Sequence, residues 1–161
     1  PMANGHPTGA VVCTTAIADS FSKGVEFFSS FGGNPVSCAI ANAVLEEIET
    51  GQLQQNAKDV GAYYLSLFKA LQKKYNCIGD VRGSGLFIGV EIVKDNSIQQ
   101  DYQLAKHIKN ELRNKHILVS TDGPFDSVIK TKPPLCFRKE NAKTVVDAID
   151  IVLEEYYSGL G

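Results

Sequence analysis

Residues 86–93 read Leu-Phe-Ile-Gly-Val-Glu-Ile-Val, and large apolar residues occupy every second position of this stretch. An alternation of period two predicts a β-strand with one buried face. The apolar residues of 53–71 and 97–114 instead recur every three or four positions, which predicts amphipathic helices. The sequence therefore predicts an α/β fold, in which residues 53–161 form an α+β domain with helices packed on a small three- to four-stranded sheet.

Further elements follow this strand. Residues 117–121 and 127–131 are short strand candidates, separated by the turn Asp122-Gly123-Pro124. Pro133-Pro134 ends the strand pairing, because proline has no backbone N–H to donate. The apolar residues of 139–157 predict a last helix.

The N-terminal part, residues 1–52, opens with a loop rich in Gly and Pro. Residues 9–14 form an apolar run of strand length, and a short helix is expected over residues 15–21. Asn34-Pro35 predicts the start of a longer helix, because Asn caps with its side-chain oxygen and Pro suits the first helical position. Gly51 predicts the end of that helix.

The composition excludes several classes of protein. The chain has 161 residues, of which 43% are hydrophobic and 21% charged, values that are typical of a globular protein. Its net charge of −2 provides no basic surface for nucleic acid or for an anionic membrane. No apolar run reaches the length of about 18–20 residues that a membrane helix needs. We therefore expect neither nucleic acid nor a membrane as a partner.

The cysteines favour an intracellular protein without a metal site. Cys13, Cys38, Cys77 and Cys136 lie far apart, and the sequence has no CxxC pair. Zinc sites need ligands that local spacing brings together, and a disulfide framework suits a shorter secreted chain. We expect four reduced, mostly buried thiols. Whether the location is mitochondrial or cytoplasmic stays open.

Glycine-rich motifs supply the candidate binding residues. Gly32-Gly33-Asn34-Pro35 opens a helix next to Ser29 and Ser30, and free N–H groups at a helix N-terminus favour an anion or phosphate site. The alternative is a glycine turn that leads into a capped helix. Arg82-Gly83-Ser84-Gly85 lacks the third glycine and the following helix of a dinucleotide motif, so we interpret it as a turn.

Four segments together resemble the class III aminotransferases, which are fold type I enzymes that use pyridoxal 5′-phosphate. These segments are residues 1–11, 30–35, 80–89 and 130–137, and they occur in the order and at the spacing of the family. The chain is most similar to the branch called alanine–glyoxylate aminotransferase 2-like. This branch includes phospho-lyases that act on ethanolamine phosphate and on 5-phosphohydroxy-lysine.

The resemblance implies a domain organisation. Residues 1–52 would be the end of the large, cofactor-binding domain and an interdomain helix, and residues 53–161 the C-terminal small domain. In this family the lysine that forms the Schiff base with the cofactor directly precedes the opening loop. This lysine would therefore directly precede Pro1. The chain is therefore expected to be a C-terminal fragment that is inactive alone. The complete protein is expected to be a homodimer formed through the large domain.

The resemblance also assigns roles to three residues. Ser30 and Gly32 are expected to bind the phosphate of the cofactor in the partner subunit. Lys130 occupies the position where aminotransferases of the family have an arginine that binds the substrate α-carboxylate. Arg meets a carboxylate with two parallel hydrogen bonds, whereas Lys offers a point charge, which favours a phosphorylated amine as substrate. The alternative is that Lys130 faces solvent on an edge strand.

Three functions are compatible with these residues. The first is a pyridoxal-phosphate-dependent phospho-lyase that acts on phosphoethanolamine or phosphohydroxylysine. The second is an alanine–glyoxylate-type aminotransferase, which acts on a primary amine with the same cofactor. The third, from another class, is a non-catalytic binding domain that retains the small-domain fold.

Overall fold

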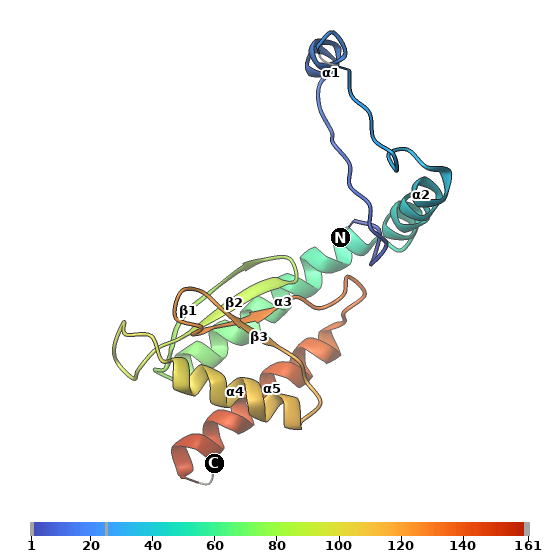
Figure 1. Ribbon diagram of the computed structural model, residues 1–161. Coiled ribbons are helices and arrows are strands. Elements are labelled where there is room, and N and C mark those ends of the chain that lie inside the picture. Colours follow the sequence, from blue (N-terminus) through green and yellow to red (C-terminus); the bar gives the residue numbers. More distant parts are fainter. Residues whose placement is uncertain (1, 25, 160–161) are drawn as a thin grey trace. The chain divides into compact units, whose positions relative to one another are not determined.

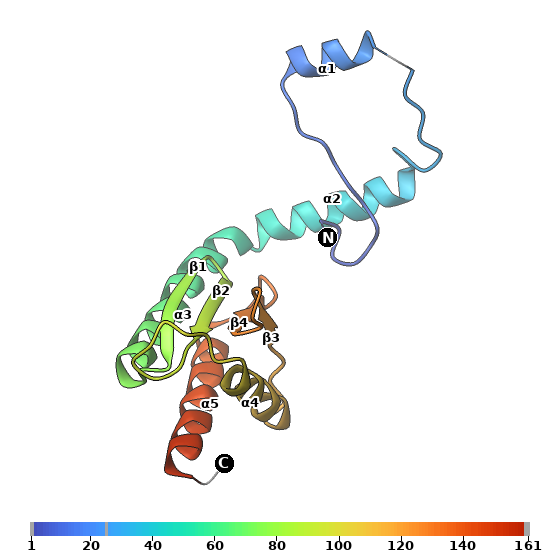
Figure 2. The ribbon, with the colours of Figure 1, turned by 60° about the vertical axis from the view of Figure 1, so that its left-hand side comes forward.

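The computed structural model describes residues 2–24 and 26–159. It divides into two compact units, Pro1–Gln52 and Leu53–Gly161, and each unit is described by itself. Pro1, the position before which the cofactor's lysine is expected, lies outside the described residues. Figure 1 labels the helices and most of the strands, and Figure 2 also labels β4.

The first unit holds two helices, α1 (Thr15–Ser22) and α2 (Pro35–Thr50), and neither helix has a buried residue. The expected start of α2 is confirmed: Asn34 is the N-cap, its Oδ1 accepts a hydrogen bond from the Ser37 N–H at 2.9 Å, and Pro35 follows. Helix α2 is the longer of the two (Figure 2).

The strand expected over residues 9–14 does not form, so this prediction is wrong. A strand needs a partner for its backbone N–H and C=O groups, and the described part of this unit offers none. Val11 and Val12 are instead 91% and 98% exposed.

The second unit is built on a four-stranded antiparallel sheet in the order β1-β2-β4-β3 (Figures 1 and 2). The strands are β1 (Ile78–Ser84), β2 (Phe87–Ile92), β3 (Ser120–Asp122) and β4 (Val128–Thr131). The predicted fold class is therefore confirmed.

Helices α3 (Leu53–Lys74), α4 (Tyr102–Asn114) and α5 (Lys139–Ser158) enclose a core with one face of this sheet. The alternation predicted for the central strand is confirmed, because the apolar side chains at every second position of β2 are buried. The core contains side chains that are almost fully buried: Tyr64, Phe68, Ile88, Val90, Ile92, Ile108, Leu112, Ile129, Ile149 and Leu153.

Several boundaries differ from the expectation. Strand β3 spans Ser120–Asp122 rather than residues 117–121. Arg82, Gly83 and Ser84 lie within strand β1, which the sequence did not predict, and the turn is confined to Gly85 and Leu86. Helix α4 begins at Tyr102 rather than near residue 97, because the Asp101 carboxylate accepts a hydrogen bond from the Leu104 N–H at 3.0 Å and caps the helix there.

A close approach of two glycines joins helix α3 to the β1–β2 turn. A Cβ atom on Gly61 would lie 2.1 Å from the carbonyl oxygen of Gly85 and 2.7 Å from its Cα. Gly85 itself has a φ of +54°, in the left-handed region that glycine adopts without strain. The hairpin can therefore rest directly on the helix backbone.

The burial expected for the thiols is wrong for three of the four. Cys77 is buried, and burial raises the pKa of its thiol. Cys13, Cys38 and Cys136 are exposed. Cys13 and Cys38 lie in the first unit, whose helices have no buried residue, and the neighbour of Cys136, Phe137, packs against the core in its place.

None of the described helices is both long and apolar enough to span a membrane.

Candidate functional site

Lys130 lies on the face of the sheet opposite to the helices. Strand alternation directs Ile129 and Thr131, both buried, toward the core, and it directs Val128 and Lys130 to the other face. Strand β4 is paired on both sides, since Lys130 is in register with Gly89 of β2 and Ser120 of β3. Lys130 is therefore not on an edge strand, and its side chain is only 24% exposed.

The ammonium of Lys130 forms an ion pair with the carboxylate of Asp122, at the end of β3. The hydrogen bond from Lys130, together with one from the Gly123 backbone N–H, holds the pKa of the Asp122 carboxyl below its usual value. Asp122 therefore stays ionised at neutral pH and neutralises the charge of Lys130.

A pocket of about 500 Å³ surrounds this pair. Its lining comes from all four strands of the sheet and from the turn after β3: Arg82, Gly83, Ser84, Phe87, Gly89, Asp122, Gly123, Val128 and Lys130. Arg82 is held in place by Asp80 at 2.7 Å and by Glu91 at 2.8 Å. Arg82 is therefore paired with two carboxylates, whereas Lys130 is paired with one.

Lys132 adds a second positive charge beside this pocket. Its Nζ lies 5.9 Å from the ring centroid of Phe87, which lines the pocket. Lys132 also contributes to the lowered pKa of Asp122, as the smallest of the causes. Sequence reasoning missed Lys132, which follows directly after the last residue of β4.

Ser30 lies in the first unit, on the turn that precedes helix α2. Its side chain is exposed. The turn satisfies its own backbone: the Gly32 N–H donates to Ser29 Oγ at 3.1 Å, and the Asn34 N–H donates to the Phe31 carbonyl at 3.4 Å. A ligand at this turn would therefore meet the hydroxyl of Ser30 rather than the Gly32 amide.

Gly32 has a steric role in this turn. A Cβ atom at Gly32 would lie 2.9 Å from Ser29 Oγ and 3.0 Å from Ser29 Cβ, so a larger residue would push the Ser29 side chain away. Gly33 has a φ of +70°, which also requires glycine. The two glycines shape the turn that presents Ser30, and phosphate binding by Gly32 stays a prediction.

Comparison with known proteins gives a consistent picture. The family model for class III aminotransferases matches residues 1–153. An alanine–glyoxylate aminotransferase 2-like protein of Drosophila melanogaster is 52% identical over 145 residues, which are 88% of this chain and 29% of the fly protein.

Two solved structures are similar to the chain as well. A phospholyase from Arthrobacter in complex with phosphoethanolamine has a TM-score of 0.92 and 37% identity, over 96% of this chain and 37% of that chain. A pyridoxal-phosphate-bound amine transaminase from an uncultivated Pseudomonas species has a TM-score of 0.75 and 30% identity, over 88% of this chain and 33% of that chain.

The chain belongs to the class III aminotransferases, so the resemblance carried by the four sequence segments is confirmed. The cofactor of this family is pyridoxal 5′-phosphate. The chain spans about a third of the length of the proteins that it matches.

Proposed function

We propose that this chain is the C-terminal portion of a pyridoxal-phosphate-dependent phospho-lyase that acts on phosphoethanolamine or phosphohydroxylysine. The observation that carries the proposal is Lys130, which lines a pocket on the sheet face opposite to the helices. The likeness to a phospholyase in complex with phosphoethanolamine supports the same reaction.

The chemistry of the pocket suits a phosphate better than a carboxylate. A planar guanidinium matches the two oxygens of a carboxylate, whereas an ammonium binds as a point charge and accepts any face of a tetrahedral phosphate. Lys130, on strand β4, and Lys132, directly after the end of that strand, together offer two such charges. A phosphate that enters must displace the Asp122 carboxylate from Lys130, which a dianion can do more readily than a single carboxylate.

Ser30 is proposed to hold the phosphate of the cofactor in a partner subunit. Its exposed hydroxyl lies on the turn that leads to Asn34, the N-cap of helix α2, and the positive end of the helix dipole favours an anion near this end of the helix. When bound, the cofactor withdraws electrons from the carbon beside the substrate amine, which weakens the bonds at that carbon. The contribution of this chain is to orient the cofactor through Ser30 and the substrate phosphate through Lys130.

A homodimer formed through the first unit, in an intracellular protein, completes the proposal. The first unit exposes large apolar side chains, among them Val11, Val12, Phe28 and Phe31, each more than 80% exposed. Exposed apolar clusters of this kind are typical of surfaces that another chain or domain covers. Reduced, exposed cysteines such as Cys13 and Cys38 fit a reducing compartment.

The second candidate is an alanine–glyoxylate-type aminotransferase. The 52% identity to a protein with that name favours it. The two candidates differ at Lys130, because an aminotransferase must bind the α-carboxylate of its amino acid substrate.

The test compares two reactions of the full-length protein that contains this chain. We expect release of phosphate from phosphoethanolamine or phosphohydroxylysine and little amino transfer from alanine to glyoxylate. Lys130→Arg is expected to shift the ratio of kcat/KM toward alanine, and Lys94→Arg, on a loop outside the pocket, serves as the control. Robust alanine–glyoxylate transfer by the unmutated protein, without phosphate release, would replace the first candidate by the second.

A further inference from the structure

A hydrogen bond between His6 and Ser37 joins two distant segments of the first unit. The Nε2 atom of His6 lies 2.8 Å from the hydroxyl oxygen of Ser37, and both residues are half-buried. Ser37 lies in the first turn of helix α2, and the two residues are 31 positions apart in the sequence. The bond therefore connects the opening loop to the start of this helix (Figure 2).

A tight turn presents His6 to the helix. The His6 N–H donates a hydrogen bond to the Ala3 carbonyl at 3.1 Å, and the two residues between them, Asn4 and Gly5, have φ values of +48° and +110°. Positive φ at both central positions is typical of a two-residue hairpin turn, for which Asn-Gly is a preferred pair. Local sequence therefore determines where the His6 ring begins.

Packing inside the first unit holds this loop at one point. Among the described residues of that unit, Ala3 alone is buried. A single small buried residue does not fix the direction of a loop, whereas a hydrogen bond depends on direction as well as distance. The half-buried bond between His6 and Ser37 is also partly protected from competing water. We therefore assign the orientation of the loop to this bond.

The path of hydrogen bonds continues from Ser37 to the turn that presents Ser30. The Ser37 N–H donates to Asn34 Oδ1 at 2.9 Å, and Asn34 Nδ2 donates to the Phe31 carbonyl at 2.8 Å. Phe31 follows Ser30 directly in the sequence. His6 is therefore linked to the neighbour of Ser30 through two intermediate residues.

We propose that His6 is a positioning residue for the phosphate of the cofactor. By holding Ser37, it fixes the N-terminal end of α2 and, through Asn34, the turn on which Ser30 lies. The inference rests on the proposed role of Ser30 and explains how its turn is ordered before the cofactor binds. Order in advance matters because a group that is already fixed loses less entropy on binding. His6 itself does not contact the cofactor in this proposal.

The test uses three substitutions in the full-length protein that contains this chain. His6→Phe keeps a flat ring and removes the hydrogen bond, and Ser37→Ala removes the hydroxyl. His6→Gln places an amide nitrogen near the position of Nε2 and can restore the bond. The matched controls are His107→Phe, which keeps a ring against Tyr156, and Ser22→Ala, on α1.

Two quantities are measured for each protein. One is the dissociation constant of pyridoxal phosphate, and the other is the rate of amide hydrogen exchange of residues 29–34 in the cofactor-free protein. We expect His6→Phe and Ser37→Ala each to weaken cofactor binding about threefold and to speed the exchange by a similar factor, the usual effect of one lost hydrogen bond.

A combination of the substitutions distinguishes the hydrogen bond from general disturbance of the loop. The double variant His6→Phe, Ser37→Ala should match the single variants, because both remove the same bond. His6→Gln should recover most of the affinity and of the slow exchange. The two controls should behave like the unmutated protein.

Three results would overturn the proposal. The first is exchange of residues 29–34 in His6→Phe at the unmutated rate. The second is a fully additive loss in the double variant, or an equal loss in His6→Gln and His6→Phe. The third is unchanged cofactor affinity in His6→Phe when Ser30→Ala weakens it.

Ser30→Ala separates this inference from the proposed function. An unchanged cofactor affinity in Ser30→Ala would contradict the cofactor role of Ser30. The exchange rates of residues 29–34, which are measured without cofactor, would still decide whether His6 holds the turn.

Discussion

Asp122 and Lys130 form an ion pair between the neighbouring strands β3 and β4, on the face of the sheet opposite to the helices. The register pairs Asp122 with Val128 and Lys130 with Ser120, so the two charged side chains meet diagonally across the strands. A diagonal contact is within reach of a long side chain such as lysine. The lysine proposed to bind substrate therefore already has a counter-ion.

Replacement of that counter-ion should strengthen phosphate binding. In the full-length protein we expect Asp122→Asn to lower the dissociation constant of inorganic phosphate about two- to fivefold, because Lys130 no longer has to leave a carboxylate. Asp126→Asn, in the same turn, changes the net charge equally and should have a smaller effect. Calorimetric titration with phosphate measures both. Weaker binding by Asp122→Asn would mean that the carboxylate positions Lys130 for its ligand.

Removal of the Ser30 hydroxyl should weaken cofactor binding. A hydrogen bond to a charged phosphate is worth ~1 kcal/mol or more, so Ser30→Ala is expected to raise the dissociation constant of pyridoxal phosphate about fivefold. The measurement is a cofactor titration of the dialysed full-length protein. Ser158→Ala, at the exposed end of α5, is the control. An unchanged titration would remove Ser30 from the cofactor site.

Gly61→Ala should destabilise the second unit strongly. The added Cβ would lie 2.1 Å from the Gly85 carbonyl oxygen. The atoms that it would meet belong to the backbone of Gly85, which cannot move aside as a flexible side chain can. We expect a loss of about 3 kcal/mol or more in the free energy of unfolding. Urea denaturation of the 161-residue chain measures it. Ser66→Ala, an exposed position on the same helix, should change stability by less than about 0.5 kcal/mol.

Asp150 should make the stability of the second unit sensitive to acid. Its carboxylate accepts hydrogen bonds from Lys74 Nζ at 2.7 Å and from the Tyr75 hydroxyl at 2.6 Å. Partial burial raises the pKa of Asp150, but these two hydrogen bonds outweigh that effect and leave the pKa below its ordinary value. A carboxyl group with a lowered pKa stabilises the fold above its unfolded pKa and loses this contribution as the pH falls through the folded pKa.

The unfolding temperature of the unmutated chain is therefore expected to fall between about pH 5 and pH 3 more steeply than that of Asp150→Asn. Asp147→Asn, whose carboxylate pairs with Lys143 on the same helix, is the control and should keep most of the acid sensitivity. Parallel slopes for all three proteins would show that the Asp150 cluster does not drive the acid response.

Local patterns in the sequence were sufficient for much of the fold. The alternation of residues 86–93 gave the central strand, and Asn34-Pro35 marked the start of α2, because each signal depends only on neighbouring residues. Strand β1 was missed because Gly79 and Gly83 interrupt its apolar pattern and its pairing with β2 shifts between Ile78 and Asp80. A glycine in a strand resembles a turn when its partner strand is unknown.

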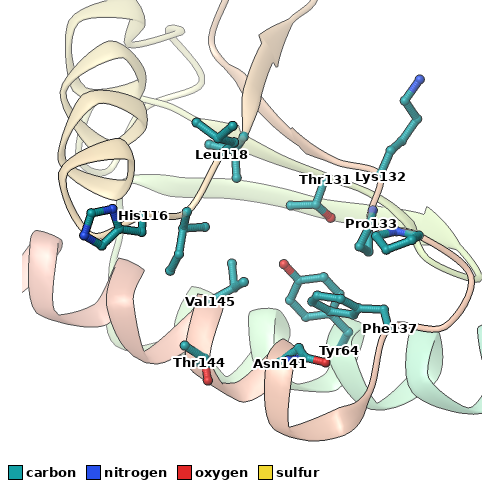
Figure 3. A pocket seen from close by; sticks show the side chains of 13 residues that line it. Tyr64, His116, Leu118, Thr131, Lys132, Pro133, Phe137, Asn141, Thr144 and Val145 are labelled. Atoms are coloured by element: carbon teal, nitrogen blue, oxygen red, sulfur yellow. The ribbon is translucent and has the colours of Figure 1, made fainter.

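The candidate site was less accessible from the sequence. Lys130 emerged from the resemblance, but its partner Asp122 did not, since the pairing of β3 with β4 fixes that contact. Tyr64 and Thr131 are separated by more than sixty positions, and only the packing of α3 against the sheet brings their hydroxyls into one pocket (Figure 3). Such contacts depend on tertiary structure and leave no local signal.

The adjacency of Lys130 and Thr131 also constrains how this protein can change in evolution or by design. Substitutions can alter either pocket separately, because neighbouring side chains of a strand face opposite sides. An insertion or deletion of one residue in β4 would exchange the two faces, burying the lysine under the helices and bringing the threonine to the outer pocket. Strand β4 should therefore tolerate substitutions but neither insertions nor deletions. Variant libraries of this protein should change β4 by substitution alone.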